Sequence, residues 1–308
     1  MNTDLISIVI PCFNQAHFLQ DAIESVEAQT HGSNEIIVID DGSTDDTVKV
    51  ASRYPEIKLV RQPNTGLAAA RNSGIKSSSG DYLVFLDADD YLEPNALAAG
   101  LGCLKKYPEC AFAWGRYRIR NAQGKVCEPG QISDRHGDAY ARLLCGNHIA
   151  MHATVIYRRE PLKIVGGFDA RLSACEDYDL YLRIARRFSI VSHEEVVAEY
   201  RRHADNMSLD SPMMLAAALR ALEAQRAYVD ENPNYKVAYA SGIRFWRRFY
   251  GVRCLRKIAR ELSEFRFADA RDDAASLFRT AGASTILLNS PVWIVRQWVA
   301  DRRWTRKG

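Results

Sequence analysis

The sequence lacks the features that mark several common classes of protein. Its seven cysteines are scattered and form no Cys-x-x-Cys pair, so neither a disulfide framework nor a zinc site is predicted. No stretch approaches the roughly 18 apolar residues that a membrane span needs. An apolar strand pattern begins at Ile6 with no basic and apolar leader before it, so we expect no signal peptide and a cytoplasmic protein.

The usual phosphate-binding loops are missing as well. Neither a G-x-x-x-x-G-K-[ST] motif nor a G-x-G-x-x-G motif follows the first strand pattern, and the segment there is Pro11-Cys12-Phe13-Asn14-Gln15. A diphosphate bound at this position would therefore have to be neutralised by a metal ion and by arginines.

Composition is that of an ordinary globular protein, but the charge is uneven. The 308 residues are 47% hydrophobic and 26% charged. Residues 241–308 carry 15 Lys and Arg against 6 Asp and Glu, a net +9, whereas the preceding 240 residues carry 26 against 32, a net −6. An acidic body joined to a basic end predicts contact of that end with an anionic surface. We expect no nucleic-acid partner.

Hydrophobic patterning predicts the fold class. Strand patterns at 6–10, 35–39, 57–60 and 82–86, the first ended by Pro11, alternate with helical patterns. Such alternation predicts an α/β fold with a doubly wound, mostly parallel sheet. The pattern changes after Lys106 and is helical from Ser211 onward. We therefore predict an α/β domain at 1–210 and a C-terminal α-helical extension at 211–308.

Acidic side chains follow two of the predicted strands. The strand within Asp81–Asp90 stops at Asp87, Asp89 and Asp90, and Asp40 follows an earlier strand. Ligands of open α/β sheets bind at the carboxyl ends of strands, and two carboxylates can share one hard cation. Acidic turns that bind nothing are the alternative.

Seven blocks carry a resemblance to a known family. They are Val9-Ile10-Pro11-Cys12-Phe13-Asn14, Val38-Ile39-Asp40-Asp41-Gly42-Ser43-Thr44-Asp45, Asn64-Thr65-Gly66-Leu67-Ala68-Ala69-Ala70-Arg71-Asn72-Ser73-Gly74, Leu86-Asp87-Ala88-Asp89-Asp90, Gly166-Gly167-Phe168-Asp169, Glu176-Asp177-Tyr178-Asp179-Leu180 and Tyr200-Arg201-Arg202-His203. In this order they resemble the family 2 glycosyltransferases, which have the GT-A fold. The resemblance covers about residues 4–210.

The resemblance implies a nucleotide site and a metal site. Asp40 matches the acidic residue that contacts the nucleotide base, and Pro11 and Phe13 match the wall of its pocket. Asp89 matches a direct ligand of Mn²⁺ or Mg²⁺, and Asp87 a residue that reaches the metal or the ribose.

His203 and Arg71 have weaker assignments. His203 matches a late histidine that joins the metal site in some relatives, with a solvated loop as the alternative. Arg71 could pair with the diphosphate or make a surface ion pair. His152 is open between core packing and acceptor contact.

Two further residues carry the predicted chemistry. Asp177 matches the catalytic base, and Glu176 matches a residue that holds the acceptor. A carboxylate base for the attacking hydroxyl typically contributes 10²–10⁴-fold to a rate. The alternative is an acidic first turn of a helix, which the helix dipole favours.

The resemblance therefore implies an inverting, metal-dependent glycosyltransferase. Its donor would be a nucleotide-diphospho-sugar, with UDP-sugars first, and its acceptor a glycan, a lipid-linked molecule or another hydroxyl. A non-catalytic nucleotide-sugar-binding protein and a sugar-phosphate nucleotidyltransferase are the rival interpretations; the second would need a Gly-rich basic loop after the first strand.

The last segment suggests a membrane contact. Residues 289–308 mix tryptophans with arginines behind Pro291, a composition that suits the surface of an anionic membrane. Packing on the preceding helices is the alternative. We thus expect a protein that is cytoplasmic or peripheral at the cytoplasmic face.

Overall fold

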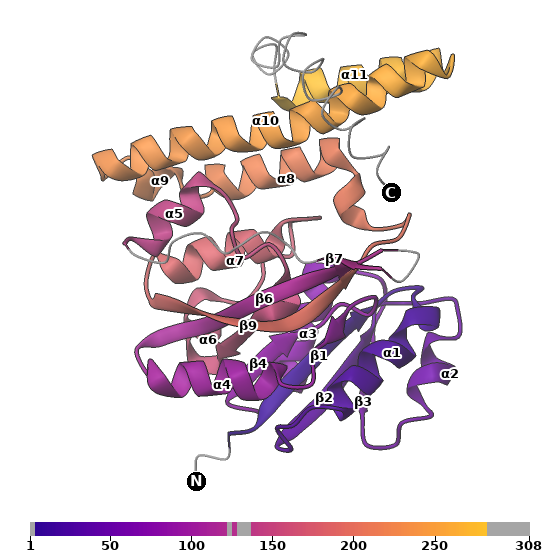
Figure 1. Cartoon of the computed structure of the whole chain (residues 1–308), viewed down its shortest axis with the longest axis vertical. Helices are drawn as coiled ribbons and strands as arrows, with labels where there is room; N and C mark the ends of the chain where they lie inside the picture. Colours follow the sequence, from indigo (N-terminus) through magenta and orange to yellow (C-terminus); the bar gives the residue numbers. More distant parts are fainter. Residues whose placement is uncertain (1–3, 122–124, 128–136, 282–308) are drawn as a thin grey trace. The chain divides into compact units, whose positions relative to one another are not determined.

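The computed structural model describes residues 4–121, 125–127 and 137–281 (Figure 1). The chain divides into two compact units, residues 1–143 with 147–206 and residues 144–146 with 207–308. The predicted membrane-contacting segment, 289–308, lies outside the described residues.

The first unit is organised around one mixed sheet. In the described part of the chain its order is β3-β2-β1-β4-β8-β6-β9-β5, with β7 paired to β6. The strands are β1 (Ile6–Cys12), β2 (Asn34–Asp40), β3 (Lys58–Arg61), β4 (Tyr82–Phe85), β5 (Tyr91–Leu92), β6 (Cys110–Arg120), β7 (Val126–Cys127), β8 (Val155–Arg158) and β9 (Ser189–Arg201). The helices are α1 (Ala16–Glu27), α2 (Thr47–Ala51), α3 (Leu67–Ser77), α4 (Ala96–Lys106), α5 (Ala139–Cys145), α6 (Arg159–Val165) and α7 (Glu176–Ala185).

The parallel half of the sheet is the part that the alternating pattern predicts. Strands β3, β2, β1 and β4 all run parallel, so their carboxyl ends meet at one edge. Strand β8 then pairs antiparallel with both β4 and β6, while β6 and β9 are parallel to each other. The change in sequence pattern after Lys106 thus corresponds to the mixed half.

The prediction that Pro11 ends the first strand is wrong. Strand β1 continues to Cys12, with Pro11 opposite Ile39 and Cys12 opposite Asp40. Because β1 pairs with β4 only as far as Val9, the missing N–H of proline interrupts no ladder on that side.

The core forms where the central strands meet the helices. The residues of β1 are all buried, as the near-continuous apolar run predicts for a strand covered on both faces. Helix α1 buries Leu19, Ala22, Ile23 and Val26, whose spacing places them on one face. Full burial of each large side chain contributes about 1.5–3 kcal/mol, so this face holds the helix on the sheet.

The second unit is helical in its described part. Its helices are α8 (Ser211–Glu223), α9 (Arg226–Val229), α10 (Pro233–Ser263) and α11 (Phe267–Ala281). Asp210 and Asn232 cap α8 and α10 by accepting hydrogen bonds from backbone N–H groups, as residues at helix starts commonly do. Proline occupies the first turn of both helices.

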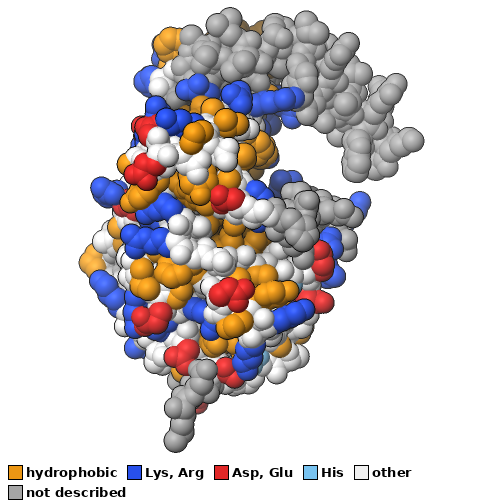
Figure 2. Space-filling view, turned by 90° about the vertical axis from the view of Figure 1, so that its left-hand side faces the viewer, with side chains coloured by type: hydrophobic (Ala, Val, Ile, Leu, Met, Phe, Trp, Pro, Cys, Tyr) orange, Lys and Arg blue, Asp and Glu red, His pale blue; other side chains and the backbone are white. Residues whose placement is uncertain are grey.

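Helix α10 is strongly basic. It carries eight Lys and Arg residues against one Glu. Several blue side chains lie in the upper part of Figure 2, next to the grey atoms. None of the helices in the described ranges is both long and apolar enough to cross a bilayer.

Candidate functional site

A buried arginine joins the two groups of carboxylates that the sequence singles out. Arg71, on α3, is 2% exposed. Its Nη2 donates to Asp87 Oδ1 at 2.6 Å, and its Nη1 donates to Glu176 Oε1 at the start of α7. Burial lowers the pKa of the guanidinium, but the charges of Asp87 and Glu176 outweigh this effect and raise it. Arg71 therefore stays charged and brings together the end of β4 and the start of α7.

Arg71 is thus turned to carboxylates in this structure. Its predicted contact with a diphosphate stays a prediction.

Asp177 lies beside this cluster in the first turn of α7. Its Oδ1 accepts a hydrogen bond from the N–H of Tyr178 at 2.7 Å. Burial and the neighbouring charge of Glu176 raise the pKa of Asp177 to about 7, although Arg71 acts in the opposite direction. A carboxylate with a pKa near the working pH has the properties of an effective general base.

Asp89 and His203 are in direct contact at the same edge of the sheet. His203 Nε2 lies 2.8 Å from Asp89 Oδ2, and Asn206 Nδ2 lies 3.4 Å from the same oxygen. Burial, together with the charge of Asp87, raises the pKa of Asp89. The structure therefore brings together the two residues for which the strongest and the weakest metal assignments were made.

The residues present fit a divalent cation that is shared with a substrate. Within the described ranges no three His, Cys, Asp or Glu side chains form a ready-made metal cage. Mg²⁺ in phosphate-transferring sites is held by one or two side chains plus phosphate oxygens, which is a smaller requirement. Asp89 and Asp87 supply carboxylate oxygens, which suit Mg²⁺ and Mn²⁺, and the imidazole of His203 lies against Asp89.

The ends of β1 and β2 form the predicted nucleotide end of the site. Asp40 is buried, and its carboxylate accepts hydrogen bonds from the N–H of Ser43 at 2.8 Å and from Arg61 Nε at 3.2 Å. Pro11 is buried, whereas Phe13 is 46% exposed and is therefore accessible to a base. The carboxylate of Asp40 has lone pairs beyond these two bonds, so base recognition stays a prediction.

Asp41 is an organising residue whose role the sequence left open. Its carboxylate accepts hydrogen bonds from the N–H groups of Thr65 and Gly66, at 3.0 and 2.9 Å, and from Gln62 Nε2 at 2.7 Å. Gly66 has a φ of +90°, which a residue with a side chain rarely adopts. These bonds fix the loop that leads into α3 and hence the start of the helix that carries Arg71.

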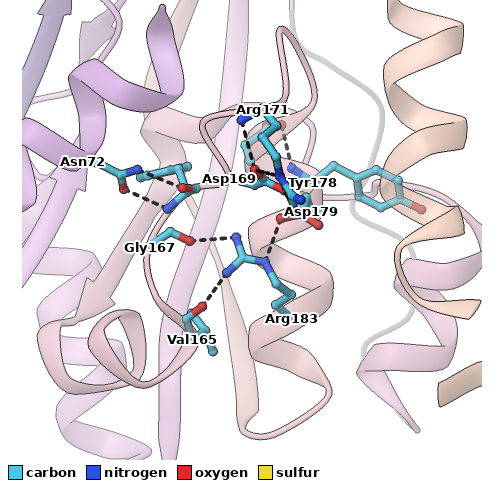
Figure 3. A network of polar contacts seen from close by, with 10 residues as sticks. Asn72, Val165, Gly167, Asp169, Arg171, Tyr178, Asp179 and Arg183 are labelled. Atoms are coloured by element: carbon cyan, nitrogen blue, oxygen red, sulfur yellow. Dashed lines mark hydrogen bonds and ion pairs between the residues drawn. The ribbon is translucent and has the colours of Figure 1, made fainter. Parts of the chain in front are cut away.

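Figure 3 shows how the loop at residues 165–169, which precedes α7 in the chain, is held. Asn72 pairs with the backbone of Phe168 in both directions, at 2.8 and 2.9 Å. Arg183 donates to the carbonyl oxygens of Val165 and Gly167 and to Asp179 Oδ2, all at 2.7–2.8 Å. The loop thereby presents the ring of Phe168 to Arg71, whose guanidinium carbon lies 5.6 Å from the ring centroid.

Arg201 holds the acidic loop after β4 in place. Its N–H donates to Asp90 Oδ1 at 3.0 Å and its Nε donates to the carbonyl oxygen of Asp89 at 3.1 Å. Its Nη2 donates to Asp21 Oδ2 of α1 at 2.7 Å. One side chain therefore ties β9 and α1 to the loop that carries Asp89.

His152 lies within the aromatic core of the first unit. It is 5% exposed, its ring stacks on Phe85 at 5.1 Å, and its Nε2 is 2.9 Å from the hydroxyl of Tyr157. Burial, with a further contribution from Arg71, lowers its pKa well below the usual value. These contacts correspond to core packing, which was one of the two interpretations for His152, the other being contact with the acceptor.

Sequence reasoning missed several residues that build the site. Asn72, Arg183, Arg201 and Asn206 position functional groups, and none of them was assigned a role. Asn72 and Arg201 do stand inside the recognised blocks, next to Arg71 and two residues before His203. Their position next to residues with assigned roles was thus the signal in the sequence that could have identified Asn72 and Arg201.

Comparison with known proteins identifies the family. The model of the glycosyl transferase family 2 matches residues 7–166, which is more than half of the chain. The chain belongs to this family.

The matching relatives are longer proteins. Chondroitin synthase of Escherichia coli is 26% identical over 209 residues, which cover 67% of this chain but 30% of that protein. Hyaluronan synthase of Pasteurella multocida is 27% identical over 209 residues, 67% of this chain and 21% of that protein. The chain therefore spans less than a third of the length of these relatives.

Solved structures show the fold. TarS 1–349 of S. aureus in complex with UDP-GlcNAc has a TM-score of 0.60 at 15% identity, covering 91% of this chain and 90% of that one. The mannosyltransferase PcManGT of Pyrobaculum calidifontis in complex with GDP-Man and Mn²⁺ also has a TM-score of 0.60, at 17% identity, covering 96% of this chain and 83% of that one. The predicted GT-A fold is confirmed by these likenesses.

Proposed function

We propose that the chain transfers a sugar, with inversion, from a nucleotide-diphospho-sugar to a hydroxyl group of a glycan or lipid-linked acceptor. Asp177 would take the proton from the attacking hydroxyl, and Glu176 would hold the acceptor. Asp89 and His203 would hold Mn²⁺ or Mg²⁺, and Asp40, Pro11, Phe13, Arg71 and Asp87 would form the nucleotide side.

The ion pairs of Arg71 carry this proposal. Glycosyl transfer needs a charged leaving group and a proton acceptor within one site, and Arg71 links the carboxylate after β4 to the carboxylate that precedes Asp177. A group fixed in this way costs little reorganisation during the reaction. The pKa of Asp177, raised to about 7 by burial and by Glu176, is suited to accepting a proton near neutral pH.

A bound divalent ion would stabilise the negative charge that develops on the leaving nucleoside diphosphate. This chain's own contribution is to orient the donor. Asp89 and His203 are held in contact. Arg201 bonds both to the loop that carries Asp89 and to Asp21 of α1, and so fixes that loop. One carboxylate base without a separate nucleophile suits a single displacement, which inverts the anomeric centre.

UDP-sugars are proposed as the first donors to test. The structural neighbours include complexes with UDP, UDP-GlcNAc and GDP-Man, so both uridine and guanosine donors belong in the panel.

A sugar-phosphate nucleotidyltransferase is a weaker proposal. It would need a flexible basic loop after β1, but Asn14 is tied to the next loop by bonds to Ser43 and Thr44 at 3.0 and 2.8 Å.

The binding experiment is a thermal-shift panel of UDP, UDP-sugars, GDP-Man and uridine, each with Mn²⁺ and with EDTA. A ligand that binds only the folded state raises Tm by mass action. We expect a diphosphate to raise Tm more with Mn²⁺ than with EDTA, and Asp89→Ala to reduce this difference while leaving the response to uridine. Equal losses for both ligands would place Asp89 at the nucleoside instead. No response to any nucleotide would contradict the proposed function.

A further inference from the structure

Strand β6 carries an arginine that has no partner in the part of the chain that the structure describes. Arg118 and Arg120, further along the same strand, form ion pairs with Glu93 and Glu199 at 3.2 and 2.6 Å. Arg116 forms no ion pair of this kind, and its Nε is buried without a hydrogen-bond partner. Unpaired buried donors cost free energy, so such a group in a native protein calls for an explanation.

A second unpartnered donor precedes Arg116 on the same face of the strand. Trp114 is 2% exposed, and its Nε1 has no hydrogen-bond partner among the described residues. Gly115, between the two, is turned to the other face, because a side chain there would meet Val197 and His193. The register between β6 and β9 shifts at this point, but the opposite orientation of Gly115 places Trp114 and Arg116 on one face.

This face of the sheet leads to the proposed catalytic carboxylates. Trp114 lies opposite Val155 of β8, and β8 in turn pairs with β4, which ends just before Asp87. Because β8 lies between β6 and β4, these two strands are separated by two strand spacings, or about 10 Å. Continuing these registers by one residue places Trp114 level with Phe85, and Arg116 and Asp87 each follow two residues later in the sequence.

Helix α7 covers the same face. Phe112, which precedes Trp114 on this face, contacts Tyr181 of α7 at 5.6 Å between ring centroids, and Tyr157 at 5.3 Å. Tyr157 also contacts Phe85 at 5.8 Å. This continuous aromatic layer runs from β4 to β6 under the helix that begins with Glu176 and Asp177.

Two N–H donors on the sheet face that α7 covers match an anionic oxygen group. A guanidinium is a planar fork that fits carboxylates and phosphates, and an indole N–H donates but cannot accept. The proposed function assigns the donor diphosphate to the ends of β1, β2 and β4, so a second anion here would come from the other substrate.

We propose that the acceptor carries a carboxylate or a phosphate and that Arg116, with Trp114, binds it. This inference rests on the proposed function. It makes the pair specificity-determining, selecting acidic over neutral acceptors of the same shape.

The test uses the full chain with UDP and Mn²⁺, or GDP if the panel selects it. Binding of 4-nitrophenyl β-D-glucuronide, 4-nitrophenyl β-D-glucoside and the 6-phosphate of that glucoside is measured by calorimetry. We expect the wild-type chain to bind one acidic probe at least about tenfold more tightly than the neutral one, because a hydrogen bond to a charged group is worth that much. Comparison of the glucuronide with the 6-phosphate shows whether the site prefers a carboxylate or a phosphate.

Four variants separate the site from a general effect of charge. Arg116→Gln should abolish the preference for the acidic probe, and Arg116→Lys and Trp114→Phe should reduce it. Arg118→Gln removes the same charge two residues away, and should leave the preference intact. Far-ultraviolet circular dichroism confirms that each variant is folded.

The inference is wrong if the wild-type chain binds neither acidic probe more tightly than the glucoside, or if Arg116→Gln keeps the preference. Either result would leave the proposed function standing when nucleotide binding is intact. Failure of every nucleotide to bind would remove both.

Discussion

Asp177 is the residue on which the proposed chemistry depends most directly. Its replacement by Asn keeps the shape of the side chain but removes the proton acceptor. We expect Asp177→Asn to lower the transfer rate by at least about 10²-fold while donor binding is retained. Steady-state kinetics and the thermal-shift assay measure the two effects separately. Loss of donor binding in step with loss of rate would assign Asp177 to the nucleotide instead.

The same residue should give the reaction its pH dependence. Because the pKa of Asp177 is raised to about 7 by burial and by Glu176, kcat/KM should rise about tenfold per pH unit below 7 and level off above it. A profile that is flat between pH 5 and pH 8 would be inconsistent with Asp177 as the base.

The raised pKa of Asp177 also has a consequence for stability. A carboxyl whose pKa is higher in the folded state binds its proton more tightly there, so its stabilising contribution is present at low pH and is lost as the pH rises from about 4 to about 7. Asp177→Asn removes this loss. The difference in Tm between Asp177→Asn and wild type should therefore increase as the pH rises over this range. The control is Asp46→Asn, at a carboxylate whose side chain is 71% exposed, and it should show no such increase.

Arg71 should be important for folding as well as for the site. Arg71→Met leaves Glu176 buried without its counter-charge, and breaking such a buried pair lowers the free energy of unfolding by about 3–5 kcal/mol. The pair with Asp87 contributes less, because Asp87 is partly exposed. Urea denaturation measures the loss. The double variant Arg71→Met with Glu176→Gln should recover part of it. A single variant as stable as wild type would show that the pair contributes nothing.

At this scale the sequence singled out acidic residues, whose roles stay predictions, but it did not show their partners. Asp87 and Asp89 stand out because they follow an apolar run, whereas Glu176 and Asp177 were assigned through the family resemblance. The guanidinium that joins Asp87 to Glu176 comes from 105 residues before Glu176. No local pattern distinguishes such an arginine from one in a surface ion pair.

At the scale of elements, the loop that precedes α7 depends on Asn72. Because its amide makes two bonds to the backbone of Phe168, Asn72→Ala leaves a backbone donor and acceptor without partners. We expect a loss of about 1–3 kcal/mol in unfolding free energy and faster amide exchange in residues 166–169. Ser73→Ala, on the same helix, is the control. Unchanged exchange in the loop would show that other contacts hold it.

The elements themselves were predictable to different degrees. Strands β1, β2 and β4 and helix α1 follow from apolar periodicity, because β1 and β4 are buried throughout, β2 is buried from its third residue onward, and α1 buries one apolar face. The partners of β8 and β9 do not follow from it, since β9 pairs with β6 across an irregular register and with β5 at its far end. Those pairings depend on tertiary contacts that a single sequence does not show.

For the molecule as a whole, the charge asymmetry of the sequence is visible in the structure. The described part of the second unit contains the basic helix α10. Contact with an anionic membrane stays a prediction that rests on residues 289–308, outside the described ranges. Full-length protein should co-sediment with anionic liposomes at low salt, whereas a form ending at Leu288 should not. If both forms stay in the supernatant, the membrane prediction is wrong.

The most direct test of the account is the release of nucleoside diphosphate by the full chain from a panel of UDP- and GDP-sugars with Mn²⁺. The account predicts release from at least one donor, its loss with EDTA and its recovery when Mn²⁺ or Mg²⁺ is added back. Asp177→Asn should bind that donor as tightly as wild type and turn it over at least about 10²-fold more slowly. Equal release by wild type and Asp177→Asn would contradict the role of Asp177 as the base. Tight donor binding by the wild type without release above background would contradict the account and favour a nucleotide-sugar-binding protein without catalytic function.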